Sequence, residues 1–153
     1  MASKKVLVLY YSGSGNTKKM AKAIAEAMKS STVNVTLEDA GKFDISSLPN
    51  FDSIVLGSPT YFSNVAWQVK KVIDESIVHS SGGKLKGKVA GIFTSAGTSS
   101  NGKDCLKMLD VALGLHHGMK VVQGIMRTDG ESDKEVEKRC QEYGKKLLKE
   151  IEK

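Results

Sequence analysis

Ser12-Gly13-Ser14-Gly15-Asn16-Thr17 separates two segments of opposite character. Residues 6–10 before it form a continuous apolar run, which is typical of a strand buried on both faces. Apolar residues after it, Met20, Ile24 and Met28, recur at helical spacing. A loop of small residues between a strand and a helix N-terminus presents backbone N–H groups and the positive end of the helix dipole to an anion. Because serine and threonine add donors without charge, this stretch predicts a phosphate site made of neutral groups.

Strand and helix patterns alternate along the whole chain. The expected strands cover residues 6–10, 33–37, 53–57, 89–93 and 119–125. The first expected helix begins after residue 17, the second and third span about 65–77 and 103–115, and the last begins after its cap at Ser132. The alternation shows no repeat and no linker, so we expect a single domain over residues 1–153. It predicts an α/β sandwich with helices on both faces of a five-stranded parallel sheet in the order 2-1-3-4-5.

Ligands of such sheets bind at the carboxyl ends of the strands, near the point where the strand order reverses. Three loops follow the expected first, third and fourth strands: the first loop, residues 12–17; the second loop, residues 58–64; and the third loop, residues 94–101. All three are rich in small and hydroxyl residues, and the second adds Tyr61 and Phe62. A phosphate cradle beside an aromatic pair predicts a planar cofactor with a phosphate tail.

Composition narrows the class of protein. The chain has 153 residues, a hydrophobic fraction of 40% and a formal net charge of +6. Its lysines are spread out and are not interleaved with aromatic residues, so we expect a solvated surface and no nucleic-acid partner. No apolar run is long enough to span a membrane, and no signal peptide is visible. Cys105 and Cys140 have no metal-like spacing, so we expect reduced thiols, no metal and a cytoplasmic location.

Other phosphate-handling classes fit the first loop poorly. A dinucleotide-binding turn needs a third glycine where Lys18 stands; Glu38 and Asp39 lie where a ribose-binding acid would, so this class is weakened and not excluded. The nucleotide P-loop pattern occurs nowhere. A cysteine phosphatase needs a thiolate and an arginine in the loop, whereas the arginines of this chain are Arg127 and Arg139. A receiver domain needs acidic residues where Tyr11 and Gly57 stand.

Four stretches, in this order, resemble a known family. Residues 12–17 resemble the phosphate loop of flavodoxins, which bind FMN. Residues 57–65, Gly-Ser-Pro-Thr-Tyr-Phe-Ser-Asn-Val, and residues 93–98, Phe-Thr-Ser-Ala-Gly-Thr, resemble the second and third flavin loops of the tryptophan-repressor-binding-protein family of NAD(P)H:quinone oxidoreductases. Residues 115–119, Leu-His-His-Gly-Met, resemble its histidine pair before the fifth strand. The resemblance covers nearly the whole chain and implies a flavodoxin-like three-layer sandwich.

The resemblance implies that chemistry resides on FMN and that the protein binds it through Ser12, Gly13, Ser14, Gly15, Asn16, Thr17, Pro59, Thr60, Tyr61, Phe62, Asn64, Thr94, Ser95, Ala96, Gly97, Thr98 and His116. The first loop would hold the phosphate through N–H groups and hydroxyls. Tyr61 and Phe62 would pack on the isoalloxazine ring, and Thr60 and Asn64 would supply directed hydrogen bonds. The third-loop backbone, with Gly97 allowing close approach, would meet the pyrimidine edge.

Three further side chains have open or different roles. For His116, contact with the flavin and interaction with the last carbonyls of a helix are equally open. Trp67 is expected in the core or an interface, and His79 on the surface.

The chain also departs from the resembled family. That family usually carries a longer segment after the fifth strand, whereas residues 123–132 lead almost directly into the last helix, and residues 78–81 lack its aromatic residue. We therefore expect a short flavodoxin that carries electrons between redox partner proteins. An NAD(P)H:quinone oxidoreductase is the alternative, and a cofactor-free interaction module is a third hypothesis. Residues 58–71 and 79–102 contain no acid, which predicts a flavin less strongly reducing than in acid-rich carriers.

Overall fold

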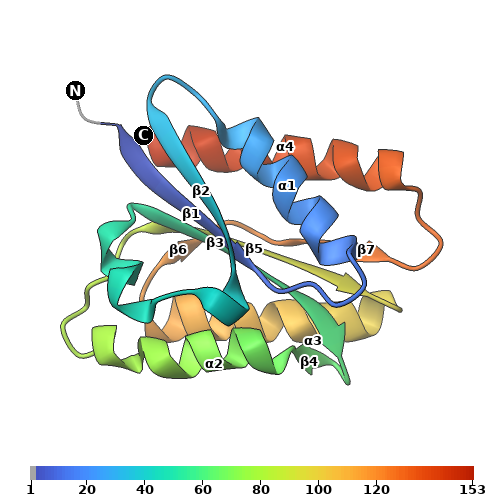
Figure 1. Ribbon diagram of the computed structural model, residues 1–153, viewed down its shortest axis with the longest axis horizontal. Helices are drawn as coiled ribbons and strands as arrows, with labels where there is room; N and C mark the ends of the chain where they lie inside the picture. Colours follow the sequence, from blue (N-terminus) through green and yellow to red (C-terminus); the bar gives the residue numbers. More distant parts are fainter. Residues whose placement is uncertain (1–2) are drawn as a thin grey trace.

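The computed structural model describes residues 3–153 as three layers, with α1 and α4 on one face of a sheet and α2 and α3 on the other (Figure 1). The strands are β1 Lys4–Tyr10, β2 Val33–Asp39, β3 Ser53–Tyr61, β4 Asn64–Val65, β5 Val89–Ala96, β6 Lys120–Val121 and β7 Ile125–Thr128. The helices are α1 Asn16–Met28, α2 Trp67–Glu75, α3 Ser99–Asp110 and α4 Asp133–Glu152; shorter helical segments are η1 Ala40–Lys42, η2 Ile45–Asn50, η3 Ser76–His79 and the π-helical η4 Val111–His116. The predicted α/β class is confirmed.

The sheet has the predicted strand order. β2, β1, β3 and β5 are parallel neighbours, and β6 and β7 both pair with the outer side of β5. β4 pairs only with β3, as the second arm of an antiparallel hairpin. With the hairpin arm β4 left out and β6 and β7 counted as one interrupted strand, the five main strands, numbered along the chain, have the predicted order 2-1-3-4-5.

The fifth expected strand is interrupted and ends later than predicted. Ala90 pairs with Val121. Phe93, three residues further along β5, pairs with Ile125, four residues further along the partner segment. The extra residue makes a bulge. Gly124 lies in it, where an added Cβ would stand 2.8 Å from a backbone oxygen of β5, so a side chain would clash with the sheet.

The side chains of β1 point alternately to the two faces of the sheet and belong to two separate core clusters. Val6, Val8 and Tyr10 pack with α1 and α4, whereas Leu7 and Leu9 pack on the α2 and α3 side. Successive side chains of a strand point to opposite faces, and both faces of β1 are covered. The continuous apolar run in the sequence follows from this double burial.

Helix limits differ from the expected ones at several ends. α3 begins at Ser99, because Thr98 caps it by accepting a hydrogen bond from the amide of Asn101 at 3.4 Å. Its C-terminal part is the π-helical η4, and α2 ends in the short η3. α4 starts as predicted after Ser132, whose hydroxyl accepts from the amide of Glu135 at 3.2 Å. Within residues 3–153, no helix has the length and apolar character needed to cross a membrane.

Candidate functional site

The three expected cofactor loops meet where the parallel strands reach their carboxyl ends, on the right of Figure 1. This side of the sheet is called the loop edge. The first loop connects β1 to α1, the second contains the end of β3 and its hairpin with β4, and the third begins in β5 and enters α3. Parallel strands bring these carboxyl ends together, as the sequence predicted.

The first loop has free backbone donors at the N-terminus of α1. Ser12 Oγ accepts hydrogen bonds from the amides of Gly15 and Lys18 at 3.1 and 3.2 Å, so this hydroxyl shapes the loop. Gly15 adopts φ 104°, a left-handed conformation suited to glycine. Within residues 3–153, the amides of Ser14 and Asn16 have no protein acceptor. Open N–H groups at a helix N-terminus are a binding site for an anion.

The second loop folds against the first. An added Cβ on Gly13 would stand 2.4 Å from the Tyr61 hydroxyl, so only glycine allows this approach. Phe62 and Ser63 form the hairpin turn with φ of 50° and 64°, and Phe62 is fully exposed. The Asn64 side-chain oxygen accepts a hydrogen bond from the amide of the next residue at 2.7 Å, so this side chain stabilises the hairpin.

Several expected ligand hydroxyls bond to one another. Thr17 and Ser95 are buried, and their hydroxyl oxygens lie 2.8 Å apart. The hydroxyl oxygens of Thr60 and Thr94 lie 2.7 Å apart, and Thr94 is fully buried. Thr98 caps α3. The structure therefore brings these residues together at the predicted edge but gives their hydroxyls protein partners. Pro59 and Ala96 are buried at the ends of β3 and β5.

A fourth loop, residues 129–132, lies beside the third and was missed by the sequence analysis. β7 runs to Thr128, which pairs with Ala96 at the end of β5. An added Cβ on Gly97 would stand 3.7 Å from a carboxylate oxygen of Asp129. Because the strand was expected to end at residue 125, Asp129 was not expected beside the third loop. The Asp129-Gly130 dipeptide, a typical turn sequence, is the signal that would have indicated it.

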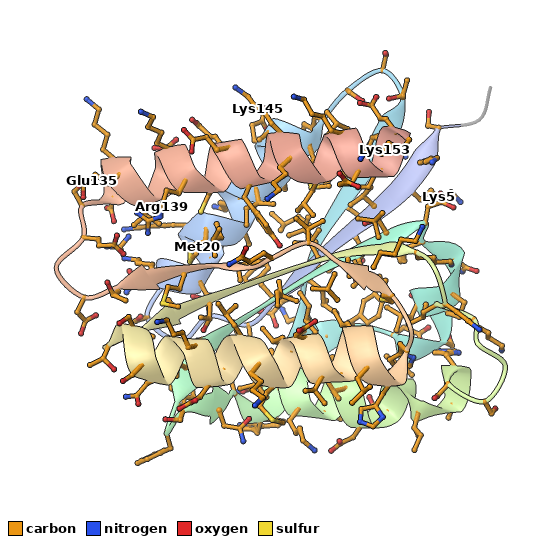
Figure 2. All side chains as sticks on the ribbon, turned by 180° about the vertical axis from the view of Figure 1, so that it is seen from behind. Lys5, Met20, Glu135, Arg139, Lys145 and Lys153 are labelled. Carbon is orange, nitrogen blue, oxygen red and sulfur yellow. The ribbon has the colours of Figure 1, made fainter. Side chains whose placement is uncertain are left out.

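Ion pairs and hydrogen bonds hold the fourth loop. The Glu131 carboxylate accepts from the Thr128 amide at 2.8 Å and pairs with Arg139 at 2.8 Å. Arg139, on the side of α4 that faces the sheet in Figure 2, also donates to the carbonyl of Met126 at 2.8 Å. The Thr128 amide, and after it Arg139, lowers the pKa of Glu131 against the opposing effect of burial. Asp129 is thus displayed on an ordered turn.

His116 does not lie with the loops, although the resemblance implied that it contacts the flavin. It ends η4, which precedes β6, and Lys120 of β6 pairs with Val89 at the start of β5. Since β5 extends from this end to the third loop, His116 is separated from the loops by roughly 20 Å of strand. Within one chain, His116 belongs to the opposite edge of the sheet.

All three histidines of the chain lie at that opposite edge. His79, expected on the surface, is buried, and its Nε2 donates to the carbonyl of Ile45 at 2.8 Å. His117 is also buried, with Nε2 2.8 Å from the Ser76 hydroxyl. Burial, followed by the charges of His79 and His116, lowers the pKa of His117. The prediction for His79 was wrong because η3 folds inward against η2.

Trp67 and the two cysteines differ in burial. Trp67, expected in the core or an interface, is 71% exposed at the start of α2, so it is not part of the core of this chain. Cys105 and Cys140 are free and buried. Burial raises the pKa of both, that of Cys140 to about 12, so both are neutral thiols.

A hollow on the α1 and α4 side of the sheet lies away from the loops. It measures about 950 Å³ and is lined by side chains of α1, α4 and β2 together with Arg127 of β7. Basic and acidic side chains alternate around it, and two of them, Lys19 and Asp133, form an ion pair at 3.1 Å. Among the described residues, no group of three or more metal-ligating side chains could hold a metal ion. The loop edge therefore remains the candidate site.

Comparisons with known proteins agree with this geometry. The family model of the flavodoxin domain matches residues 7–116. NAD(P)H dehydrogenase (quinone) of Rhizobium rhizogenes is 36% identical over 138 residues, covering 77% of this chain and 69% of the relative. NAD(P)H dehydrogenase (quinone) 3 of Rhizobium meliloti is 32% identical over 151 residues, covering 82% and 71%.

A solved structure of similar length is also close. The flavodoxin, WrbA-like protein from Agrobacterium tumefaciens superimposes with a TM-score of 0.83 and 28% identity, covering 98% of each chain. The chain belongs to the flavodoxin domain family and is a flavodoxin-like redox protein.

Proposed function

We propose that this chain binds FMN and acts as an electron carrier between redox partner proteins. The observation that carries the proposal is the first loop, where open amides at the start of α1 lie beside the Tyr61 ring. Open amides suit a phosphate, and an exposed aromatic ring beside them suits a flat cofactor. FMN combines these two features in one molecule.

The residues of the edge divide the work of binding. The amides of Ser14 and Asn16 would hold the phosphate, with no basic side chain required. Tyr61 would pack against the flavin, and the backbone of the third loop would hydrogen-bond to its polar edge. Bound FMN would supply one-electron transfer and hydride acceptance; the protein orients the flavin and sets its electrostatic surroundings.

Flavin binding is tested by titrating the flavin-free protein with FMN and with riboflavin. We expect saturable quenching of FMN fluorescence at one site per chain and weaker binding of riboflavin, because riboflavin lacks the phosphate. Equal affinity for the two would contradict the role of the first loop. Absence of binding would favour the cofactor-free interaction module.

A second candidate is an NAD(P)H:quinone oxidoreductase. It is favoured by the names of the relatives, although the chain spans only about 70% of their length. Steady oxidation of NADH or NADPH with a benzoquinone as acceptor would establish this activity. A carrier, in contrast, turns over only when a partner reductase is supplied. Sedimentation of the same preparation measures its oligomeric state.

A further inference from the structure

We propose that Tyr143 of α4 is a positioning residue, whose hydroxyl replaces one backbone hydrogen bond of the sheet and thereby sets the register of β7 and the place of the fourth loop beside the third. Tyr143 is 4% exposed. Its hydroxyl accepts a hydrogen bond from the amide of Ile92 at 3.0 Å and donates one to the carbonyl of Val122 at 2.9 Å. The hydroxyl therefore stands between β5 and the segment that follows β6.

The two backbone groups that Tyr143 joins would bond directly to each other in an uninterrupted parallel pair. The amide of Val122 donates to the carbonyl of Ala90 at 2.9 Å. In evenly spaced parallel pairing, the next bond runs from the amide of Ile92 to the carbonyl of Val122. The hydroxyl takes the place of that bond and satisfies both groups. Burial raises the pKa of Tyr143 to about 12, so the phenol keeps the proton that it donates.

The interruption reverses the alternation of side chains along the fifth strand. Val122 and Ile125 are three residues apart, which would place them on opposite faces of a regular strand, yet both pack against the core cluster of α1 and α4. Arg127, two residues further on, pairs with Asp133 at the start of α4 at 2.6 Å. A regular strand would turn Arg127 to the other face of the sheet. The fourth loop, which begins directly after β7, is placed by the same register.

Two glycines bring α4 close enough for a side-chain hydroxyl to reach the sheet. An added Cβ on Gly91 of β5 would stand 2.8 Å from a methyl carbon of Leu147 of α4. An added Cβ on Gly144 of α4 would stand 2.7 Å from a backbone oxygen of α1. Because α4 is packed closely against both β5 and α1, the Tyr143 hydroxyl is held at the point where the strand pairing is interrupted.

Amide hydrogen exchange followed by NMR tests this role without any ligand. In Tyr143→Phe, the Ile92 amide and the amides of β7 should exchange roughly tenfold faster than in the unaltered protein, because two buried backbone groups lose their hydrogen-bond partner. The amides of β1 should keep their protection. Ile151→Val is the matched control, since it removes packing from the buried face of the same helix and leaves the hydroxyl in place.

A second measurement connects Tyr143 to the flavin and rests on the proposed binding of FMN. Asp129→Asn should change the ratio of affinities for reduced and oxidised FMN about twofold in the unaltered protein. In Tyr143→Phe, the same substitution should leave this ratio nearly unchanged, because the fourth loop no longer holds residue 129 beside the third loop. In Ile151→Val, the twofold change should remain.

Three outcomes would overturn the role of Tyr143. The first is exchange of the β7 amides at the unaltered rate, and the second is the same acceleration in Ile151→Val, which would show a general loss of stability. The third is an equal effect of Asp129→Asn with and without the hydroxyl. If the protein binds no FMN, the proposed function fails, and hydrogen exchange alone decides the role of Tyr143.

The unaltered protein supplies the test if Tyr143→Phe does not fold. The Tyr143 hydroxyl proton should exchange slowly with water and show a nuclear Overhauser contact with the Ile92 amide proton. Absence of this contact would overturn the insertion of the hydroxyl between the strands.

Discussion

Phe62 and Ser63 form a two-residue turn whose φ angles of 50° and 64° suit asparagine and glycine better than phenylalanine and serine. Left-handed backbone costs an ordinary residue about 1 kcal/mol, and the fully exposed Phe62 ring recovers none of this by packing. Phe62→Asn should therefore raise the free energy of unfolding by about 0.5 to 1 kcal/mol. Urea denaturation of the two proteins measures this difference.

Phe62→Ala is the control, because it removes the same ring but has no preference for left-handed backbone. It should leave the free energy of unfolding close to that of the unaltered protein. If the alanine variant gains as much stability as the asparagine variant, loss of the exposed ring explains the effect and the turn conformation does not.

Among the elements, those set by local pattern could be predicted and those set by distant partners could not. Local sequence pattern is enough to recognise the apolar runs of β1, β3 and β5 and the periodic apolar face of α1, because burial on the sheet dictates their composition. The bulge at Gly124 depends on the register with β5, which no local pattern contains. The likeness of residues 115–119 to a family motif likewise does not indicate at which edge of the sheet His116 lies.

The same limit applies to the site. Small and hydroxyl residues identified the loop edge, but hydroxyls that bind a ligand and hydroxyls that bind each other look alike in a sequence. The contact between the Thr17 and Ser95 hydroxyls is a property of the fold and could not be predicted from the sequence. Asp129 was missed for a related reason: it reaches Gly97 through the pairing of β7 with β5.

The histidine-bearing segments η3 and η4 make folding sensitive to acid. Burial lowers the pKa of His117 in the folded state, with His79 and His116 adding to the effect, whereas unfolded histidine titrates near 6.5. Below about pH 6.5 the unfolded chain therefore binds a proton that the folded chain does not. The free energy of unfolding should fall as the pH is lowered from 7.5 to 5.5.

Urea denaturation across this pH range tests the contribution of His117. His117→Gln can still donate to Ser76 but does not titrate, so its free energy of unfolding should depend less steeply on pH. His116→Gln is the comparison, because it removes only the smallest of the three causes that lower the pKa of His117, so the free energy of unfolding of this variant should keep most of its pH dependence. Equal slopes for the unaltered protein and His117→Gln would contradict the assignment.

Charge is distributed unevenly over the whole loop edge. Residues 12–25, 53–73 and 76–103, which include the first three loops and the starts of their helices, contain no acid but several lysines. The fourth loop adds carboxylates, and Asp129 is the one beside Gly97. The expectation of a flavin less strongly reducing than in acid-rich carriers, drawn from residues 58–71 and 79–102, therefore needs to include this fourth contribution. A negative charge near the flavin disfavours its anionic reduced form.

Asp129→Asn should raise the reduction potential of bound FMN. At a separation of about 10 Å in a water-like dielectric, one charge contributes roughly 0.4 kcal/mol, or about a twofold tighter binding of reduced relative to oxidised flavin. Redox titration at low salt measures the shift, which should shrink at 0.5 M salt because the charge is exposed. Asp129→Glu should leave the potential unchanged. Glu142→Gln, on the outer side of α4, alters the net charge equally, so an equal shift in that variant would assign the effect to the charge of the whole molecule and not to the fourth loop.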